Sequence, residues 1–429
     1  MPNNNKSKKV GYSEKNTMPP LGILSIGSYL KIHGYQVSYL DLFAQKMSKN
    51  AFLEYLKTTK PDMVGVSTYT ESYAVVKQVI RLIRQTLPES VIVLGGPHVT
   101  FLPEDALKET LADYISRGEG EMTFVELIEY LNYGTIPLDK IAGISYRNEE
   151  RIIHNEDRQY IEKLDCIPLP SMEEKELQAY HIKQLIITSR GCPGRCVYCA
   201  SAALSGRRYR ARSAEHIFSE LHYKYYVKGE SYFAFLDDTF TANKKRLYQF
   251  CDYIEKSKMK IVWRCDSRTD ILSYEMADRL KETGCVAVHV GVESGSQKVI
   301  DSINKHISLE KTEKLVKYMH DIGLQVMCSF IIGHHTDTLE TIEETVSLAE
   351  KFRDQYQATI GLGLNTPFPG TELYKEHEKL GITIEKNASW SSFDLVQAVI
   401  STKNLSQSEL QNAYFKVLER IEGIGGEKK

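Results

Sequence analysis

The feature that most constrains the fold is an alternation of short apolar segments with amphipathic helical patterns. It runs twice along the 429 residues. In the first series a helix is expected at 19–34, since Pro precedes its apolar spacing and Gly34 ends it. Short apolar segments separated by helices favour a parallel, doubly wound sheet. We therefore predict an α/β, Rossmann-like domain over residues 1–146, with strands expected at 36–42, 62–69, 90–96, 112–116 and 141–147.

The second series covers residues 183–374 and contains six expected strands, each followed by a helical pattern. Six such repeats are too few for a closed eight-stranded barrel and suit a partial (β/α)6 barrel. The polar segment 147–182, with two prolines in "CIPLPS", is expected to be a linker, and residues 375–429 a short C-terminal extension. The six strands are expected at 183–189, 231–238, 260–265, 285–293, 324–333 and 358–365.

The amino-acid composition limits the expected binding partners and cellular location of the protein. The net charge of -2 gives no electrostatic reason to expect nucleic acid or an anionic membrane as partner. No apolar run is long enough to span a membrane, and the start of the chain lacks the apolar core of a signal peptide. We expect the protein in the cytoplasm, where a reducing environment makes clustered cysteines metal-binding or catalytic rather than disulfide-bonded.

Three of the eight cysteines stand in one short stretch, "SRGCPGRCVYCA", directly after the first strand of the second series. Cys192, Cys196 and Cys199 are spaced as CxxxCxxC. A structural zinc site would need a fourth ligand, and no second cysteine pair lies nearby. A redox dithiol would need only the CxxC pair. Three thiolates favour a 4Fe-4S cluster with one iron left open for chemistry.

With these residues the chain resembles the radical S-adenosylmethionine enzymes, in particular the subgroup with an N-terminal cobalamin-binding domain. The motif includes the aromatic Tyr198, which in the family lies near the adenine of the cofactor. The resemblance implies that the open iron chelates S-adenosylmethionine. One electron from the cluster then cleaves the cofactor and yields a 5′-deoxyadenosyl radical.

The family also implies S-adenosylmethionine-binding residues at the ends of later strands. Helix capping is the alternative for the acidic residues, and a solvated basic face is the alternative for the arginines of "RYRARS". The chain departs from the family after the fifth strand, where "GHHTDT" places His334 and His335 near the active-site mouth; surface histidines are the alternative. The implied residues are Tyr198, Arg210 or Arg212, Asp237, Asp238, Glu293 and Ser294.

The first series resembles the cobalamin-binding domain segment by segment, except that the polar first 18 residues hold no convincing opening strand. Either the domain is trimmed, or the natural start lies upstream. The glycines can let the backbone approach a large planar ligand, or merely form tight turns. His98 is expected to be a loop residue, and bound cobalamin to be base-off, because the chain lacks an Asp-x-His-x-x-Gly motif. The implied cobalamin-facing residues are Ser67, Thr68, Gly95, Gly96 and Glu119.

The resemblance implies methylation of an unactivated carbon in a small molecule, with an electron donor such as flavodoxin or ferredoxin as partner. A cobalamin-dependent cyclase or ring-contraction enzyme, and a cobalamin-independent radical enzyme, are the alternatives. A methylthiotransferase would need a second cluster, for which the remaining cysteines show no spacing. An iron–sulfur sensor would not explain the cofactor-like motifs at the strand ends.

Overall fold

The computed structural model describes residues 17–422 and divides the chain into two compact units, Met1–Lys183 and Gln184–Lys429. Most of the segment in which no opening strand is predicted lies outside the described residues. Within the described part of the chain, no helix is both long and apolar enough to cross a membrane.

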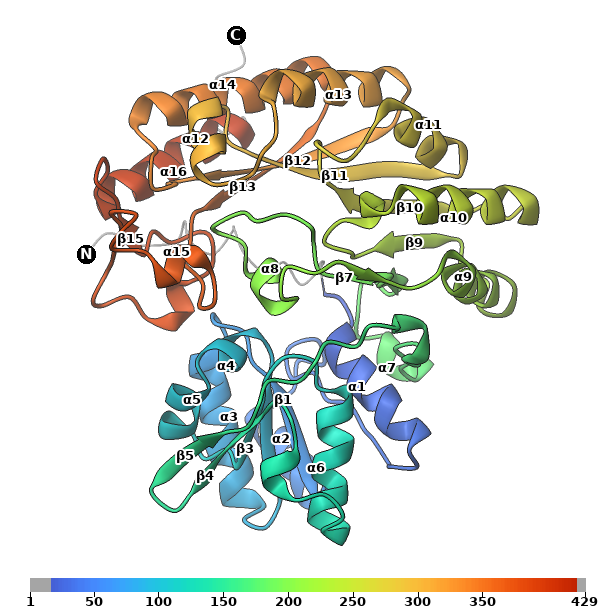
Figure 1. Ribbon diagram of the computed structural model, residues 1–429, viewed down its shortest axis with the longest axis vertical. Helices are drawn as coiled ribbons and strands as arrows, with labels where there is room; N and C mark the ends of the chain where they lie inside the picture. Colours follow the sequence, from blue (N-terminus) through green and yellow to red (C-terminus); the bar gives the residue numbers. More distant parts are fainter. Residues whose placement is uncertain (1–16, 423–429) are drawn as a thin grey trace. The chain divides into compact units, whose positions relative to one another are not determined.

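Unit 1 is built on a five-stranded sheet in the order β1-β2-β3-β4-β5. β1–β3 are parallel as predicted, whereas β4 pairs antiparallel with β3 and β5 antiparallel with β4. Figure 1 shows α3, α4 and α5 on one side of β1 and α1 and α6 on the other. The elements are α1 (Leu21–Ile32), α2 (Lys49–Thr59), β1 (Met63–Ser67), α3 (Tyr73–Thr86), β2 (Val91–Gly95), α4 (Pro97–Phe101), α5 (Pro103–Glu109), β3 (Tyr114–Ser116), α6 (Glu121–Tyr133), β4 (Ile144–Asn148), β5 (Arg151–His154) and α7 (Glu174–Leu177).

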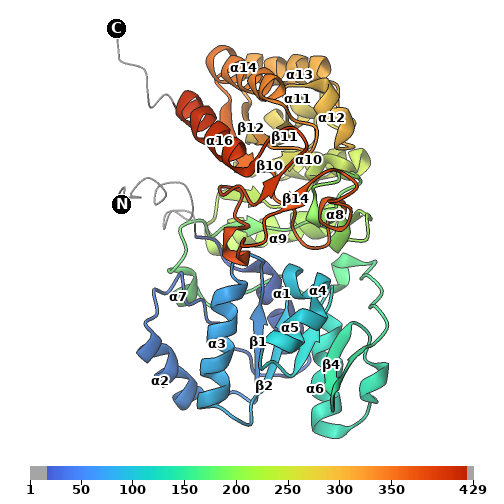
Figure 2. The ribbon, with the colours of Figure 1, turned by 90° about the vertical axis from the view of Figure 1, so that its left-hand side faces the viewer.

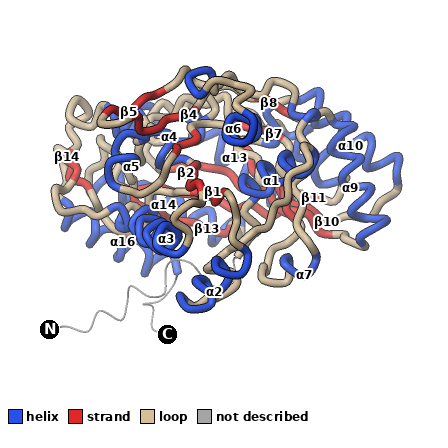
Figure 3. The backbone as a smooth tube through the Cα atoms, turned by 90° about the horizontal axis from the view of Figure 1, so that it is seen from below, coloured by secondary structure: helices blue, strands red, loops and turns tan. Residues whose placement is uncertain are grey.

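The helices cover the sheet because neighbouring side chains of a strand point to opposite faces. On β2, Val93 joins an apolar cluster with Leu30 of α1 and Leu127 of α6. Its neighbour Ile92 is also fully buried but lies outside that cluster. Figure 3 shows the same layering from below, with β1 and β2 between α3 and α6. Both faces of β2 are therefore covered, as a doubly wound sheet requires.

Two expectations for this unit need correction. Residues 36–42 form no strand, because the Asp41 carboxylate accepts hydrogen bonds from the backbone N–H groups of Phe43 and Ala44 and turns the chain. The segment 147–182, expected to be a linker, carries β5 and packs within unit 1. The Tyr180 hydroxyl, for example, donates to Asp41 at 3.1 Å.

Unit 2 contains a six-stranded parallel sheet in the order β13-β12-β11-β10-β9-β6, which confirms the partial barrel. Its six strands all lie within the predicted second series. The elements are β6 (Leu185–Ile186), β7 (Ser189–Arg190), α8 (Ala200–Leu204), β8 (Arg210–Ala211), α9 (Ala214–Lys228), β9 (Tyr232–Phe235), α10 (Lys244–Ser257), β10 (Val262–Ser267), α11 (Tyr274–Glu282), β11 (Cys285–Glu293), α12 (Gln297–Ser302), α13 (Leu309–Asp321), β12 (Gln325–Ile332), α14 (Leu339–Tyr356), β13 (Thr359–Leu364), α15 (Glu372–Lys375), β14 (Thr383–Ile384), β15 (Ile400–Ser401) and α16 (Gln407–Glu422).

The core of unit 2 lies between the sheet and its helices. Trp263 is fully buried there, and its indole N–H donates to the Thr283 carbonyl at 2.8 Å. The C-terminal extension belongs to this unit, because α16 lies along α14 (Figure 2). Arg420 of α16 forms ion pairs with Glu343 and Glu350 of α14. The extension therefore completes the helical layer over the last strands.

Candidate active site

The three-cysteine loop connects β7 to α8 at the carboxyl end of the first barrel strand. Val197, in the middle of the loop, is held from two sides: its N–H donates to the Ile303 carbonyl at 3.1 Å, and its carbonyl accepts from the Leu373 N–H at 2.9 Å. Its side chain packs with Ile303 and Ile307. These contacts fix the loop before any ligand binds.

A glycine makes the sharp entry into the loop possible. Gly191 has φ +87°, in the left-handed region that favours glycine. A Cβ atom there would overlap the carbonyl oxygen of Arg208 and the side chain of Ser205. The path of the backbone before Cys192 therefore requires glycine.

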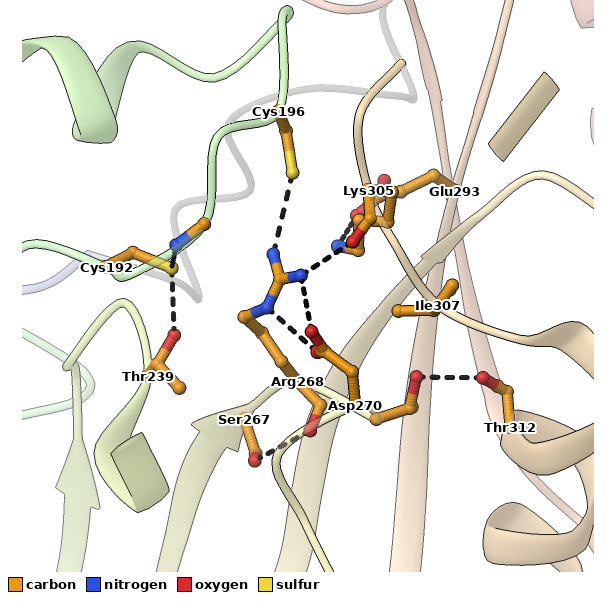
Figure 4. A network of polar contacts seen from close by, with 12 residues as sticks. Cys192, Cys196, Thr239, Ser267, Arg268, Asp270, Glu293, Lys305, Ile307 and Thr312 are labelled. Carbon is orange, nitrogen blue, oxygen red and sulfur yellow. Dashed lines mark hydrogen bonds and ion pairs between the residues drawn. The ribbon is translucent and has the colours of Figure 1, made fainter. Parts of the chain in front are cut away.

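The cysteine sulfurs lie beside hydrogen-bonding groups (Figure 4). The Gly194 N–H donates to Cys192 Sγ at 3.4 Å, and Thr239 Oγ1 lies 3.2 Å from the same sulfur. Arg268 Nη1 donates to Cys196 Sγ at 3.5 Å. Donors of this kind stabilise thiolates and tune a bound iron–sulfur cluster.

The donor set fits a 4Fe-4S cluster better than a single metal ion. Among residues 17–422, no three His, Cys, Asp or Glu side chains converge on one point that could hold an ion. In a cubane cluster each cysteine binds a different iron, so the three sulfurs need not converge. Cys192, Cys196 and Cys199 would hold such a cluster.

The two acids after β9 have different surroundings. Asp237 is buried, accepts hydrogen bonds from the N–H groups of Thr188 (2.6 Å) and Ser189 (3.0 Å), and lies 3.7 Å from Arg246. It therefore ties the end of β9 to the strand that leads into the cysteine loop. Asp238 is exposed and is the better placed of the two for a ligand.

Glu293, at the end of β11, lies in a buried polar cluster. Its carboxylate pairs with Lys305 at 2.8 Å, and Lys305 also lies 3.4 Å from the Tyr198 hydroxyl. Although burial disfavours the charged carboxylate, Lys305 holds the pKa of Glu293 below its ordinary value. Glu293 has φ +71°, a conformation that is rare outside glycine and concentrated at functional sites. The structure thus brings Glu293 and Tyr198 together, as expected for one ligand site.

Three other expected residues are buried, and the side chains of two of them, Arg212 and Ser294, contact other parts of the protein. Arg212 pairs with Glu220 at 2.7 Å, both side chains being buried, and donates to the Ile187 carbonyl at 2.9 Å. Arg210 is buried in the short β7–β8 ladder. Ser294 Oγ lies 3.1 Å from Thr345 Oγ1 and accepts from the Ser296 N–H. These contacts give Arg212 and Ser294 structural roles.

His334 is not a surface residue. Its side chain is fully buried, and neither ring nitrogen has a hydrogen-bond partner within the described part of the chain. Its ring lies 5.6 Å from that of Tyr198, and burial lowers the pKa of its imidazole. The backbone N–H of His334 donates to Asp337 at 2.9 Å, which shapes the turn after β12. His335 is partly exposed.

The motifs did not indicate four residues of this polar network: Thr239 and Arg268, which contact the cysteines, and Asp270 and Lys305, which contact Arg268. Arg268 and Asp270 follow β10 closely, so the strand-end rule could have indicated them. Burial disfavours the guanidinium, yet its bonds to Asp270 and its approach to Cys196 raise the pKa of Arg268 above its ordinary value. Lys305 lies in the loop after α12, and only the tertiary structure places it at the site.

In unit 1, polar groups without partners lie at the carboxyl ends of the strands. The hydroxyls of Thr68 after β1 and Ser116 in β3 are buried and have no hydrogen-bond partner among residues 17–422. Ser67 and Gly95 end β1 and β2 in register. The Glu119 carboxylate is engaged by the Ile161 N–H at 2.7 Å. Buried polar groups without partners fit an edge that is completed by a polar ligand such as cobalamin.

Gly96 and His98 shape this edge. Gly96 has φ +100°, and a Cβ atom there would lie 2.8 Å from both the N and the O of Thr68. His98 lies in the short helix α4 rather than in a loop, is 1% exposed, and has Nδ1 3.2 Å from Thr70 Oγ1. Burial lowers the pKa of His98 to about 4.

Comparison with known proteins matches both units. Residues 8–128 match the B12 binding domain family, and residues 186–349 match the radical SAM superfamily. An uncharacterized methyltransferase of Pyrococcus horikoshii is 32% identical over 400 residues, covering 92% of this chain and 85% of the relative. The anaerobic magnesium-protoporphyrin IX monomethyl ester cyclase of Rubrivivax gelatinosus is 28% identical over 405 residues, covering 91% and 71%.

Among solved structures, the radical S-adenosylmethionine methyltransferase TsrM from Kitasatospora setae, with cobalamin and a 4Fe-4S cluster bound, has a similar fold. The TM-score is 0.76 at 16% identity, covering 96% of this chain and 87% of TsrM. The partial barrel with its cysteine loop defines an enzyme of the radical SAM superfamily. The chain belongs to the branch of that superfamily with an N-terminal B12-binding domain. Its cofactors are a 4Fe-4S cluster, S-adenosylmethionine and cobalamin.

Proposed function

We propose that this protein methylates an unactivated carbon of a small-molecule substrate. The observation that carries the proposal is the pairing, in one chain, of a three-cysteine loop fixed at the barrel strand ends with a B12-binding unit. When bound, the cluster supplies one electron to S-adenosylmethionine, and the cobalamin supplies the methyl group. The relatives named as methyltransferases support this reaction type.

The roles of the residues follow from their contacts. Cys192, Cys196 and Cys199 hold the cluster and leave one iron for the cofactor. Glu293 and Asp238 bind polar groups of S-adenosylmethionine, and Glu293 is kept ionised by Lys305. The thiols remain reduced in the cytoplasm, where flavodoxin or ferredoxin provides the electron.

The experiment is anaerobic reconstitution followed by turnover with S-adenosylmethionine and a chemical reductant. Each of Cys192→Ala, Cys196→Ala and Cys199→Ala should abolish 5′-deoxyadenosine formation. Cys251→Ala, on the buried face of α10, should retain it. Near wild-type cleavage by any of the three loop variants would contradict the cluster assignment.

A cyclase is the second candidate, because relatives with that name align with most of this chain. Methylation by this scheme yields about one 5′-deoxyadenosine and one S-adenosylhomocysteine per product. A cyclase yields deoxyadenosine without a matching amount of the homocysteine product. The ratio of the two during turnover on the true substrate decides between them.

For the cobalamin we propose base-off binding without a histidine ligand from this chain. The candidate, His98, is 1% exposed and already lies 3.2 Å from Thr70. Electron paramagnetic resonance of the cobalt(II) form should therefore give the same spectrum for the wild type and for His98→Ala. Nitrogen hyperfine splitting that disappears in His98→Ala would contradict this.

A further inference from the structure

A buried arginine lies directly beside the cysteine loop. Arg268 follows β10, is 7% exposed, and directs Nη1 toward Cys196 Sγ at 3.5 Å (Figure 4). The loop comes so close that a Cβ atom on Gly194 would lie 2.6 Å from the same guanidinium nitrogen. The cation is therefore packed against the metal-binding loop and shielded from water.

Two partners fix the orientation of the guanidinium. Asp270 accepts from Nε and Nη2 in a two-point interaction, each bond being 2.9 Å. Nη2 also donates to the Lys305 carbonyl at 2.7 Å. A two-point carboxylate–arginine pair has little rotational freedom. These contacts therefore hold Nη1 in its orientation toward Cys196 Sγ.

We propose that the Arg268–Asp270 pair sets the reduction potential of the iron–sulfur cluster. The inference rests on the proposed function, since it assumes a cluster on Cys192, Cys196 and Cys199. Reduction adds one electron from an external donor to a cluster that already carries three thiolates, and no bond is made or broken. A cation beside a ligating sulfur stabilises the added negative charge, and a hydrogen bond to that sulfur acts in the same direction.

The pair makes two opposite predictions. Arg268→Gln removes the cation and leaves the Asp270 carboxylate near the cluster, so the potential should become more negative. Asp270→Asn leaves the Arg268 cation without its counter-charge, so the potential should become more positive. Arg268→Lys keeps the charge and should shift the potential least. A purely structural role would not give shifts of opposite sign.

The test is a redox titration of the reconstituted full-length protein without S-adenosylmethionine, in which the reduced cluster is followed by electron paramagnetic resonance. We expect Arg268→Gln and Asp270→Asn each to change the equilibrium constant for reduction by roughly tenfold in opposite directions, about 59 mV for one electron. Arg279→Gln is the matched control. Arg279, in α11, also pairs with several carboxylates, those of Asp252, Glu255 and Glu282, but among residues 17–422 it makes no hydrogen bond or ion pair with the three loop cysteines. It should leave the potential unchanged.

The inference would be overturned if the reduction potential were the same in all variants. It would also be overturned if Arg268→Gln and Asp270→Asn shifted the potential in the same direction. Loss of S-adenosylmethionine affinity in Arg268→Gln at an unchanged potential would overturn it too, and would assign the arginine to the cofactor instead. If Arg268→Gln assembles no cluster, Asp270→Asn must still shift the potential upward. Iron and sulfide analysis of the wild type separates the two proposals, because a wild type without a cluster contradicts the proposed function itself.

Discussion

Substituting Gly96 by alanine tests whether the turn after β2 is built for a close backbone approach. Gly96 has φ +100° and ψ 176°, a region that only glycine adopts readily. The added Cβ would lie 2.8 Å from both the N and the O of Thr68. Both atoms are held by backbone hydrogen bonds, since the Thr68 N–H donates to the Gly95 carbonyl and the Thr68 carbonyl accepts from the His98 N–H.

The loss of stability expected in Gly96→Ala has two parts. An unfavourable backbone conformation costs about 1–3 kcal/mol. An overlap with rigid backbone atoms costs about the same again, because the neighbouring chain must shift. The sum of about 2–6 kcal/mol is a large part of the 5–15 kcal/mol that usually stabilises a domain. Unit 1 should therefore be strongly destabilised, and its cobalamin lost with the distorted edge.

Hydrogen–deuterium exchange measured by mass spectrometry can separate the units. In Gly96→Ala, peptides from β1, β2 and α3 should lose protection, while peptides from β10–β12 and the iron content stay at wild-type levels. Gly22→Ala is the matched control, because a Cβ atom at this helical, exposed glycine meets nothing within 4 Å. It should stabilise unit 1 by up to about 1 kcal/mol. Unchanged protection and cobalamin content in Gly96→Ala would refute the reasoning.

Two further predictions concern other sites. A Cβ atom in Gly291→Ala would overlap the Glu293 carboxylate and lie 2.7 Å from Lys305 Nζ, so affinity for S-adenosylmethionine should fall roughly tenfold or more with iron content unchanged. Equilibrium dialysis measures this, and wild-type affinity would contradict the role of Glu293. The folded-state pKa of His98, about 4, lies below the ordinary value of 6.5, so the unfolded chain takes the proton first as the pH falls. The contribution of neutral His98 to the free energy of unfolding is therefore complete above about pH 6.5 and is lost toward pH 4. By pH 5 the free energy of unfolding should have fallen by about 2 kcal/mol. Urea titrations followed by pulse proteolysis should show that the free energy of unfolding depends on pH more steeply in the wild type than in His98→Gln. An equal pH dependence in the two proteins would contradict this prediction.

The sequence indicated those features that depend on local spacing. The helix at α1 has a proline before its first turn and begins and ends close to the predicted positions. The six barrel strands and the cysteine loop follow from periodicity and motif spacing. Strand direction was not predictable in this way: the apolar pattern of β4 fits a parallel or an antiparallel neighbour equally well.

The contacts of individual side chains were the second feature that could not be predicted from the sequence. The family pattern indicated Arg212, but its guanidinium pairs with Glu220 eight residues further along, on α9, which the motif does not show. For His334, predicted near the active-site mouth with a surface position as the alternative, the sequence did not show that the turn stabilised by Asp337 buries its side chain. Lys305 meets Glu293 only because the loop after α12 folds back on β11. Each of these depends on tertiary packing.

The distribution of the cysteines has a consequence for their chemical selectivity. All eight are free, and Cys251, Cys265, Cys285 and Cys328 are buried in the core of unit 2. Burial raises the pKa of Cys251 to about 11 and that of Cys328 to about 12. Since the thiolate is the nucleophile, an alkylating reagent should leave these core thiols unmodified in the folded apoprotein. In the apoprotein, modification should then be confined to the exposed Cys166 and the partly exposed Cys192, because Cys196 is buried and burial raises the pKa of Cys199. The loss of labelling at Cys192 after reconstitution would report how far the cluster protects this ligand.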